Sequence, residues 1–283
     1  MNWLGYLLVA VLLLGAAVYF GLPPMLRAMG LHPHYEIPAF NLEGRRALII
    51  TTSHATLGET GRPTGVFGSE MTVPYYAFLD AGLEVDIASI RGGEVPIQPW
   101  SMSWPLATHD DTRFLRDADA MGKLRASIPI ANVRAEDYDV IFMAGGWGAA
   151  YDLAQSAELA ALISQADADG RIIGSVCHGA LGLVSATKPD GSPLVQGRRV
   201  TGVTDLQIEQ LGITITPKHP EEELREAGAL FESRSAFMDI FATHTVVDGN
   251  LVTGQNQNSG YETAHRILER LEAQSEVRTE AQP

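Results

Sequence analysis

Short apolar or alternating runs recur along the chain and are separated by longer segments of helical spacing. The short runs, which are typical of strands, are residues 45–53, 83–90, 138–146, 171–176 and 198–204. The segments with helical spacing are residues 70–82, 156–170, 179–186 and 260–274. Strands that alternate with helices predict a mostly parallel sheet with helices on both faces.

A hairpin is predicted near the end of this pattern. Residues 244–254 contain two strand-like runs on either side of Asp248-Gly249, a dipeptide that favours tight hairpin turns. Residues 101–121 do not alternate, so we expect them to lie beside the sheet. The pattern as a whole therefore predicts a domain of the α/β class.

The first residues differ from the rest because they are apolar without interruption. Residues 3–22 contain no charged side chain and are about as long as a helix that crosses a bilayer. A secretory signal peptide is the alternative, with a poor cleavage site at residues 15–17, but no basic residue precedes the apolar run. We predict one uncleaved transmembrane helix, which Pro23 and Pro24 should end.

The charges that flank this helix bear on its orientation. Arg27, Arg45 and Arg46 follow the helix, and no basic side chain precedes it. Basic residues near a membrane span favour the cytoplasmic side. We therefore expect a single-pass membrane protein whose remaining domain lies on the cytoplasmic side.

The proline-rich segment after the helix predicts a linker. Residues 23–44 contain four prolines and no sustained period. The histidines of this segment, His32 and His34, should be solvated. The predicted domain then covers residues 45–274, and the polar residues 275–283 should form a flexible tail.

Composition narrows the classes of function. The chain has 283 residues, 46% of them hydrophobic, and a formal net charge of −14. Such acidity argues against a nucleic-acid surface, which needs clustered lysine and arginine. The single cysteine, Cys177, cannot form an internal disulfide. The sequence contains no phosphate-binding loop, dinucleotide fingerprint or zinc-ligand spacing, so we expect neither a metal nor an organic cofactor.

The single cysteine lies in the stretch IIGSVCHGALGL, residues 172–183. It falls between a predicted strand and a predicted helix, with Gly174 before it and Gly179 after it, as at the sharp turn that presents the nucleophile of acyl-transfer hydrolases. A helix N-terminus favours the thiolate, so we expect the pKa of Cys177 to lie below that of a free thiol. The alternative is a buried cysteine that serves as a small apolar side chain.

Three further segments make the pattern more specific. They are TGVFGSE (64–70), YDVIFMAGGWG (138–148) and DGNLVTGQN (248–256). With VCHG they resemble the PfpI-like branch of the class I glutamine amidotransferase-like superfamily, most closely the heat-shock glyoxalase III group and its deglycase relatives. The resemblance covers about residues 45–272. It implies a flavodoxin-like α/β sandwich with three layers.

The resemblance also implies catalytic residues. Cys177 matches the nucleophile of the family, and His178 matches the histidine that follows it. Glu70 matches a glutamate that hydrogen-bonds the cysteine and can relay protons. Without the resemblance, an acidic residue in the first turn of a helix has an ordinary explanation, because it is favoured there by the helix dipole.

A glycine turn in the family faces the nucleophile with its backbone N–H groups. Gly145 and Gly146 match this turn, and Gly179 matches the residue behind the nucleophile. Such N–H groups can stabilise a developing oxyanion. The group usually reads GGHG here, whereas this chain has Trp147 in place of the histidine. The indole should narrow the pocket or suit a more apolar substrate.

The acid that orients the histidine in the family has no clear match. Ungapped counting from Cys177 reaches Ile208, and the nearest acids are Asp205 and Glu209. Either acid could serve after a small shift, or the chain could lack this residue. A histidine without an orienting carboxylate is a weaker base.

The resemblance and the site residues together predict a cofactor-independent glyoxalase III or deglycase-type enzyme. A thiolate would add to a small dicarbonyl such as methylglyoxal, His178 or Glu70 would move a proton between the adjacent carbons, and hydrolysis would give a hydroxy acid. Two alternatives stay open: a redox-sensing or holdase-like stress protein, and an amidase- or peptidase-like hydrolase. The expected partners are a small reactive carbonyl compound and the membrane, and the sequence leaves a homodimer open.

Overall fold

The computed structural model describes residues 3–236 and 238–280, with side chains up to residue 275. Within this part of the chain, seven strands form one sheet in the order β3-β2-β1-β4-β5-β9-β8. Their bounds are Arg46–Thr51 (β1), Glu84–Ser89 (β2), Ile128–Pro129 (β3), Val140–Met143 (β4), Ile172–Val176 (β5), Thr245–Asp248 (β8) and Leu251–Gly254 (β9). Neighbouring strands pair in parallel except β8 and β9. The five strands from β2 to β9 follow the flavodoxin-like order, and the predicted α/β class is confirmed.

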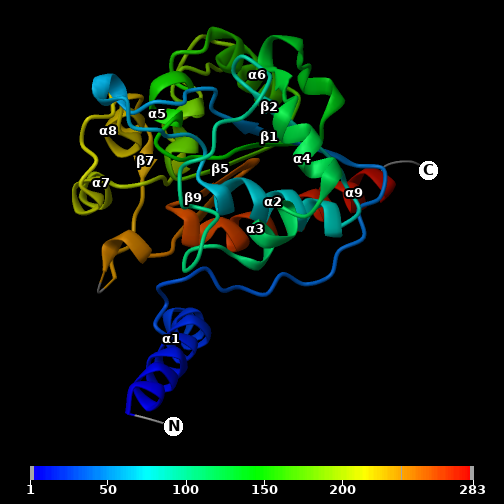
Figure 1. Cartoon of the computed structure of the whole chain (residues 1–283). Helices are drawn as coiled ribbons and strands as arrows, with labels where there is room; N and C mark the ends of the chain where they lie inside the picture. Colours follow the sequence, from blue (N-terminus) through cyan, green and yellow to red (C-terminus); the bar gives the residue numbers. More distant parts are fainter. Residues whose placement is uncertain (1–2, 237, 281–283) are drawn as a thin grey trace.

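Helices cover both faces of the sheet (Figure 1). Helices α2 (Gly68–Asp80) and α9 (Gly260–Glu280) pack together on one face, and α6 (Ala157–Ala168) lies on the other. Successive strand residues point to opposite faces, so that Ile49 packs in the core beneath α2 and α9, and Leu48 packs in the core beneath α6. The remaining elements are α3 (His109–Phe114), α4 (Ala118–Arg125), α5 (Ala149–Asp152), α7 (Asp205–Leu211), α8 (Pro220–Glu226), β6 (Arg199–Val200) and β7 (Leu230–Phe231).

One of three predicted elements near the site forms as expected, and the other two differ from the prediction. The hairpin forms as predicted, with β8 and β9 antiparallel around Gly249. The strand predicted at 198–204 is reduced to β6, which pairs with β7 in a separate two-stranded sheet. The helix predicted at 179–186 is a 3₁₀ helix, Cys177–Leu183. It begins at the cysteine itself.

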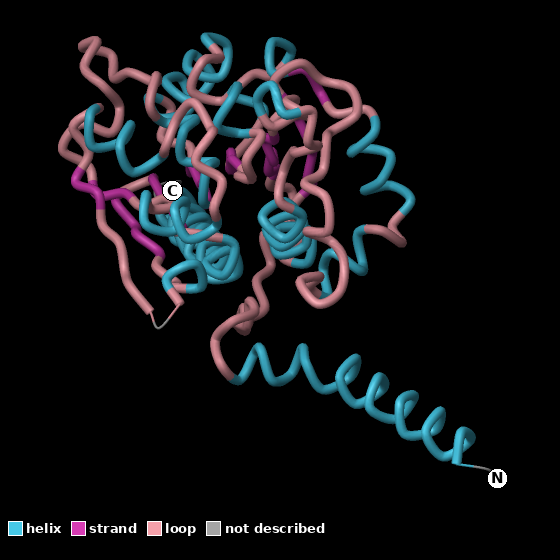
Figure 2. The backbone as a smooth tube through the Cα atoms, turned by 60° about the vertical axis from the view of Figure 1, so that its left-hand side comes forward, coloured by secondary structure: helices cyan, strands magenta, loops and turns pink. Residues whose placement is uncertain are grey.

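Helix α1 (Trp3–Ala28) stands apart from the domain (Figures 1 and 2). It is long and apolar enough to cross a membrane, and none of its residues is buried. The expected stop at Pro23 and Pro24 is wrong, because α1 continues to Ala28. Proline suits helical φ but cannot donate to the carbonyl four residues earlier. The Tyr19 carbonyl that Pro23 leaves free accepts a hydrogen bond from Trp104 Nε1 at 3.2 Å.

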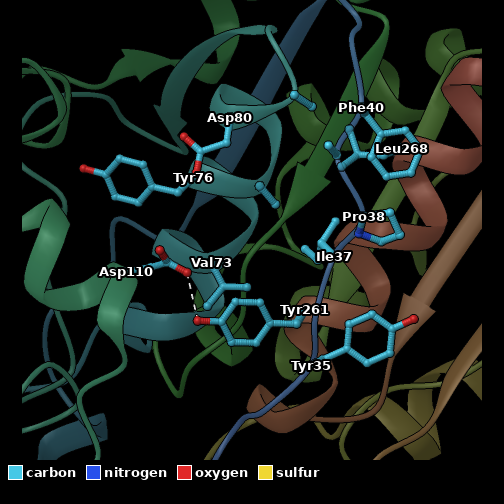
Figure 3. A pocket seen from close by; sticks show the side chains of 13 residues that line it. Tyr35, Ile37, Pro38, Phe40, Val73, Tyr76, Asp80, Asp110, Tyr261 and Leu268 are labelled. Carbon is cyan, nitrogen blue, oxygen red and sulfur yellow. Dashed lines mark hydrogen bonds between the residues drawn. The ribbon is translucent and has the colours of Figure 1, made fainter.

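The linker after α1 lies along the domain (Figure 3). It runs across α2 and α9, where Ile37 and Phe40 pack against the core and a cavity of about 350 Å³ remains. Tyr35 Oη is 2.7 Å from His265 Nδ1. His32, which we expected to be solvated, is buried, whereas His34 is exposed. The segment between α1 and β1 therefore fixes where the helix departs from the domain.

The C-terminal helix is longer than the sequence pattern indicates. Helix α9 continues to Glu280, so the tail expected from residue 275 is helical over its first part. Ser275 Oγ donates to the Leu271 carbonyl at 2.8 Å and accepts from Arg45 at 2.9 Å. These bonds satisfy polar groups in a segment without an apolar period. Residues 281–283 of the predicted tail lie outside the described residues.

Candidate active site

Cys177 occupies a sharp turn at the carboxyl end of β5. Its φ of +58° lies in the left-handed region, which is unusual for a residue other than glycine. A strained backbone conformation of this kind persists only where the surrounding structure holds the residue in place, and such residues are concentrated at functional sites. The side chain is 8% exposed and lies at the edge of the sheet where open α/β folds bind ligands.

Glu70 lies in the first turn of α2, with its carboxyl group against Cys177. The side chain is 1% exposed, and Gly145 N–H donates to it. Burial raises the pKa of Glu70 to about 8, while the hydrogen bonds from the Cys177 thiol and Gly145 oppose the rise. Glu70 is therefore largely protonated at neutral pH. A carboxyl group in this state can both donate and accept a proton.

The expected low pKa of Cys177 is contradicted. Burial raises the pKa of the thiol well above its ordinary value, and the adjacent Glu70 carboxylate raises it further. The N–H groups of His178 and Gly146 act in the opposite direction but do not outweigh these effects. The helix after the cysteine is a 3₁₀ segment, which aligns fewer peptide dipoles than the α-helix we had expected.

His178 is brought next to the nucleophile, but its environment makes it a poor base. Its Nδ1 lies 3.4 Å from Cys177 Sγ, and its Nε2 has no hydrogen-bond partner among the described residues. Burial lowers the pKa of His178 to about 3. The ring faces Trp147, with centroids 4.9 Å apart. The imidazole is therefore neutral at physiological pH and cannot form an ion pair with the thiolate.

Neither acid proposed to orient His178 contacts it. Asp205 lies 3.5 Å from His219 Nδ1, at the start of α7. Glu209 is exposed on the same helix. Both candidates are therefore rejected, and no carboxylate in the described part of the chain orients His178. The third alternative, a site without this acid, describes the structure.

The predicted glycines have separable roles. Gly145 donates to Glu70, and a Cβ there would meet Glu70 Oε2 at 2.5 Å. Gly146 (φ +99°) directs its N–H to Cys177, as His178 does. Backbone N–H groups that converge on a nucleophile in this way are candidate oxyanion donors. Gly179 does not line the cavity: a Cβ there would lie 2.1 Å from the Met143 carbonyl, so this glycine lets the turn approach β4.

A cavity of about 230 Å³ opens above the Cys177–Glu70 pair. Trp147 lines it as predicted. Sequence reasoning missed the rest of the wall, which comes from loops and helix ends: Phe67, Trp100, Leu106, Leu211, Ile240, Phe241 and Gln257. Of these, Phe67 lies inside the TGVFGSE motif, so only that residue carried a signal in the sequence. Apart from Gln257, the cavity is apolar except at its floor.

Comparison with known proteins identifies the family. The profile of the DJ-1/PfpI family matches residues 63–270, a range that includes Glu70, Cys177 and the glycine turn. The chain belongs to the DJ-1/PfpI family. The resemblance found in the sequence is thereby confirmed, and α1 and the linker lie outside the family match.

Relatives of this DJ-1/PfpI protein include named enzymes. It is 30% identical to glutathione-independent glyoxalase HSP31 of Saccharomyces cerevisiae over 79% of this chain and 96% of that protein. Among solved structures, glyoxalase III of Candida albicans superposes with a TM-score of 0.73 at 25% identity, over 80% of this chain and 97% of that one. A 24 kDa rapid encystment protein of Francisella tularensis gives a TM-score of 0.75 at 31% identity, over 80% and 99%.

Substitution of Gly179 should destabilise the domain. Gly179→Ala places a methyl group against the β4 backbone, and we expect a loss of about 1–3 kcal/mol in the free energy of unfolding, as for other overpacked cores. Gly122→Ala is the matched control, because a Cβ in that α4 position meets nothing. Urea titration measures both variants, and equal stability would contradict the close approach at Gly179.

Glu70 should make stability depend on pH. The pKa of Glu70 is about 8 in the folded protein, above its value in the unfolded chain. The protonated carboxyl group therefore contributes fully to the free energy of unfolding below the unfolded pKa, and this contribution is lost as pH rises through the folded pKa. Glu70→Gln cannot ionise, so its Tm relative to the parent should increase between about pH 5 and pH 9. The effect of His178, whose pKa is lowered, is shared by both proteins and cancels. A Tm difference that does not vary with pH would contradict the buried carboxyl, and Glu59→Gln, at an exposed site, is the control.

Proposed function

We propose that this protein is a glutathione-independent glyoxalase of the glyoxalase III type, which converts small 2-oxoaldehydes such as methylglyoxal into 2-hydroxy acids. The Cys177–Glu70 pair at the floor of the cavity carries the proposal, because it combines a nucleophile with an acid–base group whose pKa is about 8. The glyoxalase names of relatives matched over almost their whole length support it.

The first step forms a bond between Cys177 Sγ and the aldehyde carbon. Glu70, as the carboxylate, takes the thiol proton, and the N–H groups of Gly146 and His178 stabilise the oxyanion until Glu70 returns the proton to it. The product of this step is a hemithioacetal. The step therefore draws on the fraction of Glu70 that is ionised, which a pKa of about 8 supplies near neutral pH.

The second step moves hydrogen between adjacent carbons. Glu70 removes the proton from the former aldehyde carbon and passes it to the neighbouring carbonyl oxygen, which gives an enediol. Glu70 then moves the hydroxyl proton of the first carbon to the second carbon. The first carbon is oxidised to a thioester and the second is reduced to an alcohol, so the step requires no external electron acceptor. Water then cleaves the thioester, releasing the hydroxy acid and the Cys177 thiol.

The geometry favours Glu70 over His178 as the base. A group with a pKa near 8 accepts and releases protons at neutral pH, whereas the pKa of His178 is about 3. The same observations disfavour the two alternatives. A redox-sensing thiol is exposed and has a low pKa, and a cysteine hydrolase uses a basic histidine. Cys177 and His178 have the opposite properties.

Lactate formation from methylglyoxal without added thiol tests the proposal. Cys177→Ser should abolish turnover with the fold intact, and Glu70→Gln should lower kcat by about 10²–10⁴-fold, the usual contribution of a general base. Glu59→Gln should leave it unchanged. Lactate formed at the parental rate by Cys177→Ser would refute the mechanism.

We further propose that α1 crosses a membrane and holds the catalytic domain on the cytoplasmic side. Its length, its apolar composition and its separation from the core support a membrane span. Arg27 at its end, followed by Arg45 and Arg46, supports the orientation.

Membrane extraction tests this second proposal. The full chain should remain with membranes after alkaline carbonate treatment. Leu13→Arg with Leu14→Arg should release it, because each arginine at a helix centre costs roughly 2.5–3.5 kcal/mol of insertion energy. Leu206→Arg, on the exposed face of α7, is the matched control and should stay membrane-bound. Recovery of the uncleaved parent in the soluble fraction would exclude an anchor.

A further inference from the structure

One loop of the catalytic cavity contacts α1. Trp100 and Leu106 line the cavity, and the loop between them carries Trp104. The Trp104 ring stacks on Tyr19 of α1 at a centroid distance of 5.6 Å, and its Nε1 donates to the Tyr19 carbonyl that Pro23 leaves free. This loop therefore connects the cavity to the membrane helix.

A second loop of the cavity lies near the end of α1 through Asn258. Ile240 and Phe241 line the catalytic cavity. Asn258 Nδ2 lies 3.3 Å from the Phe241 carbonyl and 3.4 Å from the carbonyl of Gly30, just beyond α1. In Figures 1 and 2 the segment between β7 and β8 reaches the edge of the domain from which α1 departs. The two loops and the helix end thus occupy one side of the molecule.

The rim on this side is suited to a bilayer surface. Trp100, Trp104 and Met238 are 56%, 44% and 41% exposed, although the chain as a whole is strongly acidic. Tryptophan and tyrosine are enriched at the membrane–water boundary, and Tyr19 lies within the last turn of the apolar stretch. Arg27 and Arg234 line the neighbouring cavity between α1 and the second loop, and basic side chains beside a membrane span are attracted to anionic lipid headgroups.

The catalytic cavity, with a volume of about 230 Å³, is more apolar than a substrate as polar as methylglyoxal requires. Beyond the floor residues, Gln257 is the one polar side chain among the described residues that line it. The wall offers contact to a hydrocarbon chain and few hydrogen bonds to a polar substrate.

We propose that the substrates are 2-oxoaldehydes with an alkyl chain, which partition into the bilayer and enter the cavity between these two loops. The proposal rests on the glyoxalase activity and the membrane anchor proposed above. The reaction is unchanged: the thiol adds to the aldehyde carbon, the proton moves to the neighbouring carbon, and water releases the 2-hydroxy acid. The alkyl chain lies against the apolar wall, and the ionised product leaves for water.

A homologous series of straight-chain 2-oxoaldehydes tests the inference on the full chain in phosphatidylcholine–phosphatidylglycerol vesicles. Each added methylene should raise kcat/KM by about three- to fourfold until the cavity is filled, as expected for apolar burial.

Trp104→Glu and Met238→Glu place a charge on the rim outside the catalytic cavity. They should lower kcat/KM for the long substrates at least about tenfold, since a charge is unfavourable at an apolar membrane contact, and leave methylglyoxal turnover unchanged. Leu230→Glu, exposed on β7, is the matched control and should change neither.

The outcomes separate the proposals. Absence of methylglyoxal turnover in the parent would remove the glyoxalase function itself. Turnover of methylglyoxal with no gain from chain length would overturn the apolar substrate class. A gain from chain length that survives both rim variants would overturn entry from the membrane. Quenching of Trp104 by brominated lipid chains, measured as the difference between the parent and Trp104→Phe, gives an independent readout, and its absence would also overturn entry from the membrane.

Discussion

The buried carboxyl group of Glu70 is the constraint on which the site depends. It has no basic partner among the described side chains, so its proton is retained to a pKa of about 8. Three close approaches create this arrangement: the Gly145 N–H to the carboxyl group, the Cys177 turn at positive φ, and Gly179 against β4. A side chain at Gly145 would displace the carboxyl group of Glu70, and one at Gly179 would push the turn away from β4. The glycines therefore determine the chemistry as much as the polar residues do.

The strands and the turn at Cys177 could be predicted because each depends on local pattern. Apolar runs between polar residues identify buried strands, and glycine spacing identifies the turn. The pKa of Cys177 could not be predicted in this way. It depends on burial by loops that show no period, such as those carrying Trp100 and Phe241. Local helix-dipole reasoning gave the wrong sign, because desolvation outweighs two N–H donors in a closed site.

The N-terminal segment shows a second limit of sequence reasoning. Two prolines indicate a helix end, yet α1 passes through them, and Trp104, far along the chain, donates to the Tyr19 carbonyl that Pro23 leaves free. A linker rich in proline indicates a free tether, yet His32 is buried and Tyr35 meets His265. Both errors have one cause: contacts between distant parts of the sequence override local propensity. Their consequence is that α1 and the linker make contacts with the domain that the sequence pattern does not indicate.

The electrostatics of the cavity match a reaction that begins neutral and ends charged. An uncharged dicarbonyl meets a neutral thiol and a carboxyl group that is largely protonated at neutral pH, so no ion must be desolvated on entry. The product is a carboxylate. None of the described lining residues is a lysine or arginine that would retain it, and the pKa of about 3 keeps His178 neutral. The reaction thus creates a carboxylate inside an apolar cavity, where a charge is least stable. The same burial that raises the pKa of Glu70 therefore favours release of the acid into water.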